Sequence, residues 1–188
     1  LMVFNNIRTF REFYTEQVHY HEQDSKERYR VTVKNNVDTV RRIIEYENRK
    51  IESELKSFLG DKIKVALSVA SGIYNENKGK IPDDEIRKKI VKQLSQMRFN
   101  EGRGYYYVHD FERNIVLGHA VAEYIGTDFS KKIDVRGNNI IDVQKNALRG
   151  KEVGFATLYF TKPDDTEKEY PKLVCITKFA PLNLLIGT

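Results

Sequence analysis

The sequence predicts an α+β fold, in which a long N-terminal helix precedes a five-stranded antiparallel sheet with flanking helices. The first prediction rests on the placement of helix breakers, because all 11 glycines and 4 prolines lie at or after Gly60. The second rests on the stretch after Gly102, where short runs of aromatic and β-branched residues alternate with turn residues. A length of 188 residues favours one domain, with or without an appendage.

The segment before Gly60 is expected to form one continuous helix, because glycine and proline cost about 1 and 3 kcal/mol in a helix interior. A helix over residues 8–58 is about 75 Å long at 1.5 Å per residue, which exceeds a domain of this size. It is therefore expected to protrude or to pair with another chain. Glu47 and Glu54 interrupt its apolar face, so a regular coiled coil is not expected. That face consists of Val33, Val37, Val40, Ile44, Ile51, Leu55 and Phe58.

Two further helices are expected before the sheet. Gly60 and Asp61 are expected to end the first helix, and a second helix then runs to about residue 77. Pro82 and the acidic residues after it are typical of a helix N-terminus and predict a third helix. The expected buried residues are Ile63, Leu67, Ala70, Ile73 and Tyr74 in the second helix, and Ile86, Ile90, Leu94 and Met97 in the third.

The remaining chain reads as five strands, one helix and loops. Strands are expected at residues 104–110, 114–118, 153–161, 172–179 and 183–187, a helix at 138–149, and a loop with a helical turn at 123–132. Residues 162–171 are charged and are expected to form an exposed hairpin loop.

Composition and motifs exclude several classes of protein. No apolar run approaches the roughly 18 residues of a membrane span. No nucleophile elbow, phosphate-binding loop or dinucleotide motif is present, and Cys175 alone excludes an internal disulfide. The net charge of +5 and pI of about 9.1 are the only support for nucleic-acid binding. We therefore expect no catalytic residues, no cofactor and no nucleic-acid partner.

The four histidines do not form a convincing metal site. His19 and His21 lie on different faces of the predicted helix. His109 and His119 end two neighbouring strands and could approach each other, but only Asp110 is close enough in sequence to complete a site. No metal is expected.

Tyr105, Tyr107 and His109 occupy alternate positions and therefore share one face of their strand. On one interpretation they are core aromatics. On the other they line a cavity, with Arg103 and Lys172 as cationic donors for a carboxylate, because charge-assisted hydrogen bonds to carboxylates are short and strong. Composition alone does not choose between these interpretations.

Several motifs, in order, resemble a known family. They are the stretch from Met97 to Asp110, Gly118-His119-Ala120, Gly126-Thr127-Asp128, Gly154-Phe155 with Thr161-Lys162-Pro163, Lys172-Leu173, and the closing stretch from Pro181 to Thr188. This sequence is similar to single Cache domains, the PAS-like extracytoplasmic sensor modules of bacterial chemoreceptors, sensor histidine kinases and diguanylate cyclases. The preceding long helix is also typical of that family.

The resemblance implies a sensor domain and not an enzyme, although the full-length protein can carry a kinase, cyclase or methyl-accepting output. It implies a helix at 1–60 that is membrane-proximal and forms a homodimer, followed by a Cache sensor domain at 61–188. It also implies a periplasmic location in an inner-membrane protein, between two transmembrane helices that this chain does not contain.

The resemblance further implies that the domain binds a small carboxylate such as acetate, propionate or pyruvate and passes a conformational change across the membrane. The implied ligand-binding residues are Arg103, Tyr105, Tyr107, His109, His119 and Lys172. The sequence departs from the family pattern with Ala120, Leu158, Phe160, Val174, Cys175 and Leu184, several of which replace polar groups. The alternative is therefore a ligand-free domain of the same fold that signals through a partner protein or a dimer rearrangement.

Overall fold

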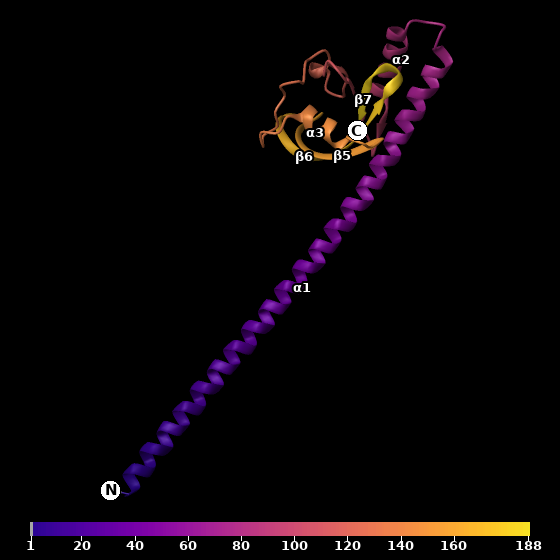
Figure 1. Cartoon of the computed structure of the whole chain (residues 1–188). Coiled ribbons are helices and arrows are strands. Elements are labelled where there is room, and N and C mark those ends of the chain that lie inside the picture. Colours follow the sequence, from indigo (N-terminus) through magenta and orange to yellow (C-terminus); the bar gives the residue numbers. More distant parts are fainter. Residues whose placement is uncertain (1) are drawn as a thin grey trace. The chain divides into compact units, whose positions relative to one another are not determined.

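A computed structural model of the chain describes residues 2–188, with side chains described from residue 10 onward. The described chain contains the helices α1 (Met2–Asn77), α2 (Asp83–Gln96) and α3 (Ile140–Ala147) and the short 3₁₀ turns η1 (Ala122–Tyr124) and η2 (Ala180–Leu182). Its strands are β1 (Arg98–Phe99), β2 (Gly104–Tyr105), β3 (Tyr107–Asp110), β4 (Val116–Gly118), β5 (Val153–Lys162), β6 (Asp165–Phe179) and β7 (Leu184–Gly187), as Figure 1 shows. The predicted α+β fold with a long N-terminal helix is confirmed.

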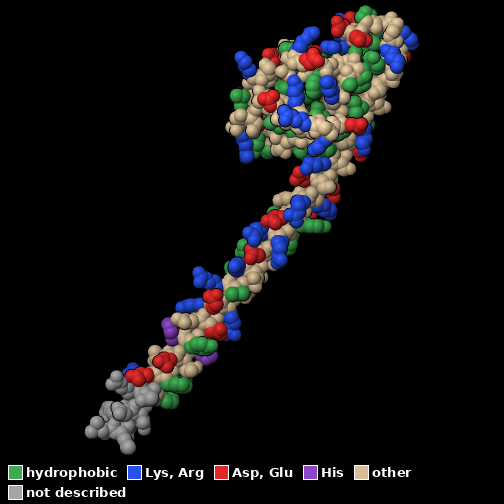
Figure 2. Space-filling model, viewed as in Figure 1, with side chains coloured by type: hydrophobic (Ala, Val, Ile, Leu, Met, Phe, Trp, Pro, Cys, Tyr) green, Lys and Arg blue, Asp and Glu red, His purple; other side chains and the backbone are tan. Residues whose placement is uncertain are grey.

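The chain divides into two units, residues 1–52 and residues 53–188. The first unit is helical, and nearly all of its described side chains are exposed. Figure 2 shows hydrophobic side chains interspersed with charged ones along it. Short-range ion pairs such as Arg28 with Asp24 and Arg41 with Asp38 add a few tenths of a kcal/mol each to a helix of this kind.

The predicted helix end at Gly60 is wrong, because α1 continues through this residue to Asn77. Leu59, Ile63, Ala66 and Ala70 are buried in the core of the second unit and lie on both sides of the glycine. Their burial outweighs the roughly 1 kcal/mol that a glycine costs in a helix interior.

The third predicted helix is confirmed as α2. Pro82 occupies the N-cap position with φ −59°, and the three following acidic residues lie in the first turn, where the helix dipole favours negative charge. Ile86, Ile90 and Leu94 are fully buried, as their spacing predicts.

The main sheet has the strand order β4-β3-β7-β6-β5, and each neighbouring pair is antiparallel. The predicted strand at 104–110 is divided, because β2 pairs with β1 in a separate two-stranded ribbon while β3 joins the main sheet.

The predicted loop at 162–171 is also wrong, since β5 and β6 continue toward each other and pair as far as Lys162 with Asp165. The Asp165 carboxylate stabilises this hairpin by accepting hydrogen bonds from the N–H groups of Glu167 and Lys168 and from the Tyr170 hydroxyl. The Lys162 ammonium lies 3.9 Å from the centre of the Tyr170 ring, and this cation–π contact further stabilises the turn.

The sheet buries a hydrophobic cluster on each face. One cluster contains side chains of α1 and α2 together with Tyr106 and Val108, and the other contains side chains of α3 and the loop before it together with Tyr107. The predicted alternation along this strand is therefore confirmed. Both clusters lie within the second unit, and the α3 side carries the candidate site.

Candidate functional site

A cavity of about 240 Å³ lies in the second unit, where β2, β3 and β6 meet the loops around η1 and the helix α3. This volume accommodates several water molecules or a small organic molecule. All six residues that the sequence singled out line it: Arg103, Tyr105, Tyr107, His109, His119 and Lys172. Its remaining walls are mainly apolar and include Phe129, Ile140, Leu158, Phe160 and Val174.

Lys172 supplies the cation of the cavity. Its Nζ donates to the backbone carbonyl of Thr161 at 2.6 Å and to the Tyr105 hydroxyl at 3.3 Å. The ammonium also lies 5.8 Å from the centre of the Phe160 ring. Among the ion pairs of the described residues, none places a carboxylate on this ammonium. Burial, together with a smaller contribution from the charge of Lys162, lowers the pKa of Lys172 to about 8.

His119 offers a neutral donor next to this cation. Its Nδ1 accepts the backbone N–H of Val121 at 3.0 Å, so the proton of the neutral ring resides on Nε2. Burial lowers the pKa of His119 to about 4, and the nearby Lys172 contributes in the same direction. The ring packs edge-on against Tyr105 at a centroid distance of 5.1 Å. His119 is therefore uncharged at neutral pH and can donate to an anion.

His109 is only 2% exposed and is the most deeply buried of the titratable lining residues. Burial lowers its pKa to about 3, with a smaller contribution from His119. Its Nδ1 is sealed from solvent and has no hydrogen-bond partner. The ring contacts Tyr107 and Phe129 at centroid distances of 5.4 and 5.5 Å.

The two tyrosines are protonated at neutral pH, since burial raises the pKa of Tyr105 to about 12 and that of Tyr107 well above its usual value. The Tyr107 hydroxyl donates to Gln144 Oε1 at 2.7 Å, and Gln144 Nε2 donates to the carbonyl of Ile140. This chain of hydrogen bonds fixes β3 to α3 and closes one wall of the cavity. Sequence reasoning missed Gln144, although its position four residues after Ile140 places both on one helix face.

Arg103 occupies the rim of the cavity. Its side chain is 73% exposed, and its guanidinium donates to Asn100 Oδ1 and lies 3.8 Å from Glu101 Oε2. The β1–β2 turn holds it there, with Asn100 and Glu101 at positive φ. Of the two predicted cations, Lys172 is therefore the half-buried one and Arg103 the solvated one.

Five of the six residues that depart from the family pattern fall into two groups. Leu158, Phe160 and Val174 line the cavity and make it more apolar. Leu184 does not line it, because this side chain is fully buried in the cluster on the α1 side of the sheet. Cys175 lies in the same cluster as Leu184, and burial raises the pKa of its thiol to about 12, in agreement with its interpretation as a small buried residue.

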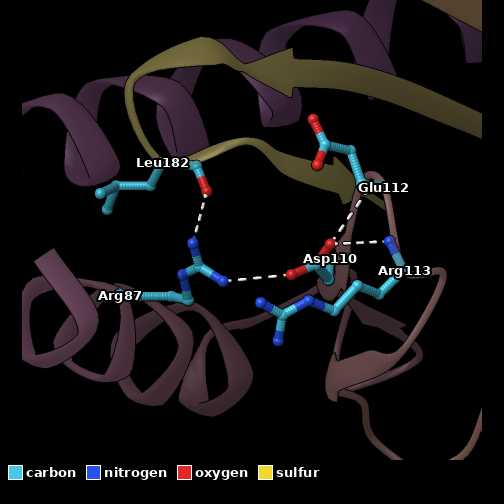
Figure 3. A network of polar contacts seen from close by, with 5 residues as sticks. All are labelled: Arg87, Asp110, Glu112, Arg113 and Leu182. Carbon is cyan, nitrogen blue, oxygen red and sulfur yellow. Dashed lines mark hydrogen bonds and ion pairs between the residues drawn. The ribbon is translucent and has the colours of Figure 1, made fainter.

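No group of three metal-binding side chains exists among the described residues. Asp110, the one acidic residue near the two histidines in sequence, has another role (Figure 3). Its carboxylate accepts from Arg87 at 3.1 Å and from the N–H groups of Glu112 and Arg113, while Arg87 also donates to the carbonyl of Leu182. This network joins α2, the β3–β4 turn and the 3₁₀ turn η2 that precedes β7, next to His109 in the sequence.

The family model described as a Cache domain, dCache_2, matches residues 10–188. The chain belongs to the Cache domain family. This assignment confirms the family that the resemblance in its motifs predicts.

Solved structures with the same fold include a Cache chemosensory domain solved for its carboxylic acid recognition (20% identity, TM-score 0.59, covering 68% of this chain and 88% of that one). A periplasmic sensor domain of a chemotaxis protein is 23% identical, with a TM-score of 0.57 and coverage of 68% and 90%. A methyl-accepting chemotaxis protein from Vibrio parahaemolyticus is 18% identical, with a TM-score of 0.64 and coverage of 74% and 89%.

No curated protein sequence is similar enough to this Cache chain to count as a relative. Over residues 2–188, no helix combines the length and hydropathy that crossing a membrane requires.

Proposed function

We propose that this Cache domain is the extracytoplasmic ligand-sensing part of a transmembrane chemoreceptor and that it binds a small organic anion in the cavity at Lys172. One observation carries the proposal: a half-buried ammonium faces an apolar cavity, and no carboxylate of residues 10–188 pairs with it. An unpaired charge in such a place is unfavourable for folding alone, because burial penalises the charged form. A bound carboxylate supplies the missing counter-ion.

The groups around Lys172 suit a carboxylate. The His119 Nε2–H and the hydroxyl of Tyr105 are neutral at pH 7 and can direct hydrogen bonds to a second carboxylate oxygen. Neither carries a negative charge that would repel an anion. Charge-assisted hydrogen bonds of this kind contribute about 1.5–3 kcal/mol each.

The comparisons support the receptor context. One solved structure with this fold recognises a carboxylic acid, and another is the periplasmic sensor of a chemotaxis protein. We propose accordingly that this domain is periplasmic and that membrane-spanning helices flank it in the receptor.

Signalling requires that the ligand bind one arrangement of the domain better than another, since equal affinity for both shifts no equilibrium. The cavity lies against the loops at 118–136 and against residues near the end of β7. A ligand that orders these loops and shifts β7 would pass a displacement to the segment that follows the sheet.

We also propose that residues 1–60 form the dimerisation helix and residues 61–188 the sensor domain. Within residues 1–52, apolar side chains with heptad-like spacing are more than 40% exposed: Val33, Val37, Val40, Ile44 and Ile51. A second copy of this helix would cover them. The double variant Val40→Glu/Ile44→Glu should be monomeric by sedimentation, whereas Arg42→Glu on another face should leave a dimer; two dimers would contradict this assignment.

The alternative is a ligand-free domain that signals through a partner protein, and the apolar replacements Leu158 and Val174 in the cavity wall favour it. A thermal-shift screen with acetate, propionate and pyruvate separates the two. The ligand-sensing proposal predicts that at least one raises the melting temperature of the wild type. Lys172→Ala should abolish that increase, Arg103→Ala should reduce it, and the exposed control Lys168→Ala should leave it unchanged. An increase that is the same in all variants would rule out this site.

A further inference from the structure

Lys172 and His109 lie at two separate places in the cavity, and the proposed anion site is at Lys172. Lys172 contacts Tyr105, Thr161 and Phe160, whereas His109 contacts Tyr107 and Phe129. His119 lies between the two places, with its ring centroid 5.1 Å from that of Tyr105 and 6.3 Å from that of Tyr107.

His109 has no hydrogen bond to either ring nitrogen in the described protein, although the residue is only 2% exposed. Its Nδ1 is sealed and has no acceptor beside it, so the neutral ring is more stable with its proton on Nε2. Nε2–H is then a donor available to a ligand in the cavity that this residue lines. Leaving such a donor unpaired is unfavourable, and a ligand oxygen would satisfy it.

The wall between the two places is apolar and aromatic. It includes Phe129, Ile140, Leu158 and Phe160, and no aspartate or glutamate lines the cavity. A ligand that reaches from Lys172 to His109 must therefore have an apolar body. An ammonium group on that body would find no carboxylate among the described lining residues to pair with it.

We infer that the cavity selects an elongated monocarboxylate whose carboxylate binds Lys172 and His119 and whose far end carries an uncharged oxygen acceptor for His109. This inference rests on the proposed function, because it assigns the ligand class of the same site. His109 is the residue that distinguishes such a ligand from a simple alkyl carboxylate. Acetate, which is too short to reach His109 from Lys172, would occupy only the anion site.

Isothermal titration with acetate, hexanoate, 5-oxohexanoate and 6-aminohexanoate tests this inference. Each buried methylene adds about 0.8 kcal/mol, so hexanoate should bind the wild type at least tenfold more tightly than acetate. 5-Oxohexanoate should bind more tightly than hexanoate, and 6-aminohexanoate should bind more weakly. His109→Phe should lower the preference for 5-oxohexanoate over hexanoate by about tenfold, while His19→Phe in the first unit should not change it.

Two outcomes would overturn the inference and leave the proposed function intact: acetate binding as tightly as hexanoate, or His109→Phe leaving the 5-oxohexanoate preference unchanged. If His109→Phe does not fold, the wild-type series alone decides, because equal affinities across it contradict the elongated ligand. Absence of binding by every carboxylate would instead overturn the proposed function, and the inference with it.

Discussion

Replacing Lys172 by methionine tests whether this residue binds a ligand or stabilises the fold, because the two roles predict opposite changes in the free energy of unfolding. Methionine keeps the length and apolar stem of the side chain and removes the charge. In the wild type, burial lowers the pKa of Lys172 from its ordinary 10.5 to about 8. Each pH unit of such a difference corresponds to about 1.4 kcal/mol, so a fully buried ammonium would destabilise the fold by about 3 kcal/mol at pH 7.

Solvent screening reduces this amount, because the Lys172 side chain is only partly buried. We take about 1–2 kcal/mol as the destabilisation that Lys172→Met relieves. The variant also loses the 2.6 Å hydrogen bond to the Thr161 carbonyl, which contributes about 1 kcal/mol. The ligand-free variant should therefore be as stable as the wild type or up to about 1 kcal/mol more stable at pH 7.

The affinity for carboxylates, in contrast, should decrease in Lys172→Met. Loss of one charge-assisted hydrogen bond of about 1.5–3 kcal/mol weakens the affinity by roughly 10- to 150-fold. Urea denaturation measures the stability and isothermal titration with propionate measures the affinity, with Lys168→Met as the exposed control on the same strand. A variant that loses more than 2 kcal/mol of stability and keeps its affinity within threefold would refute the reasoning.

Three further predictions follow from the same geometry. Lys172 must be charged to bind an anion, and its pKa is about 8. The dissociation constant for propionate should therefore be nearly constant from pH 6 to 7.5 and rise about tenfold per pH unit above 8, which titrations across this range would show. Burial raises the pKa of Asp110, but the N–H groups of Arg113 and Glu112 and the charge of Arg87 lower it by more, so the pKa lies below its usual 3.8. This stabilisation is present above about pH 4 and is lost as the pH falls through the lowered pKa, so Asp110→Asn should cost about 1–3 kcal/mol at pH 7 and less in denaturation measurements below pH 3. A Cβ at Gly154 would lie 2.6 Å from the backbone oxygen of Ala147, so Gly154→Ala should lower the melting temperature by several degrees, whereas Gly72→Ala, which meets nothing within 4 Å, should not.

Short-range sequence patterns predicted those parts of the fold that depend on interactions between residues close in sequence. The alternation of Tyr105, Tyr107 and His109 gave their shared face, and Pro82 with its acidic successors gave the start of α2. Both features depend on residues within one or two turns of each other. The fold class followed from the placement of glycine and proline and from the strand-like runs after Gly102, and the structure confirms it. The family followed from motif order, and the family match over residues 10–188 confirms it.

Features that depend on distant contacts could not be predicted. Gly60 reads as a helix end in isolation, but burial of Leu59 and Ile63 against the sheet carries the helix through it. The charged hairpin at 162–171 is ordered by the Asp165 carboxylate, which no periodicity reveals. Gln144 was missed because its partner, the Tyr107 hydroxyl, is 37 residues away in sequence.

The difference in solvent exposure between Arg103 and Lys172 also depends on contacts between residues distant in sequence. Both are cations that flank strands in the sequence, and only the folded structure shows that one is solvated at a turn and the other half-buried beside Tyr105. The role of these six lining residues in ligand binding stays a prediction, which the binding measurements above test.

The titration of Lys172 itself, followed by NMR of lysine Nζ in isotopically labelled protein, tests the central claim most directly. We predict a pKa of about 8 in the free protein. Saturating propionate should raise it by at least one pH unit, because an anion that binds the charged form tenfold more tightly than the neutral form produces that shift. A pKa that propionate leaves unchanged, or one near 10.5 in the free protein, would contradict the account.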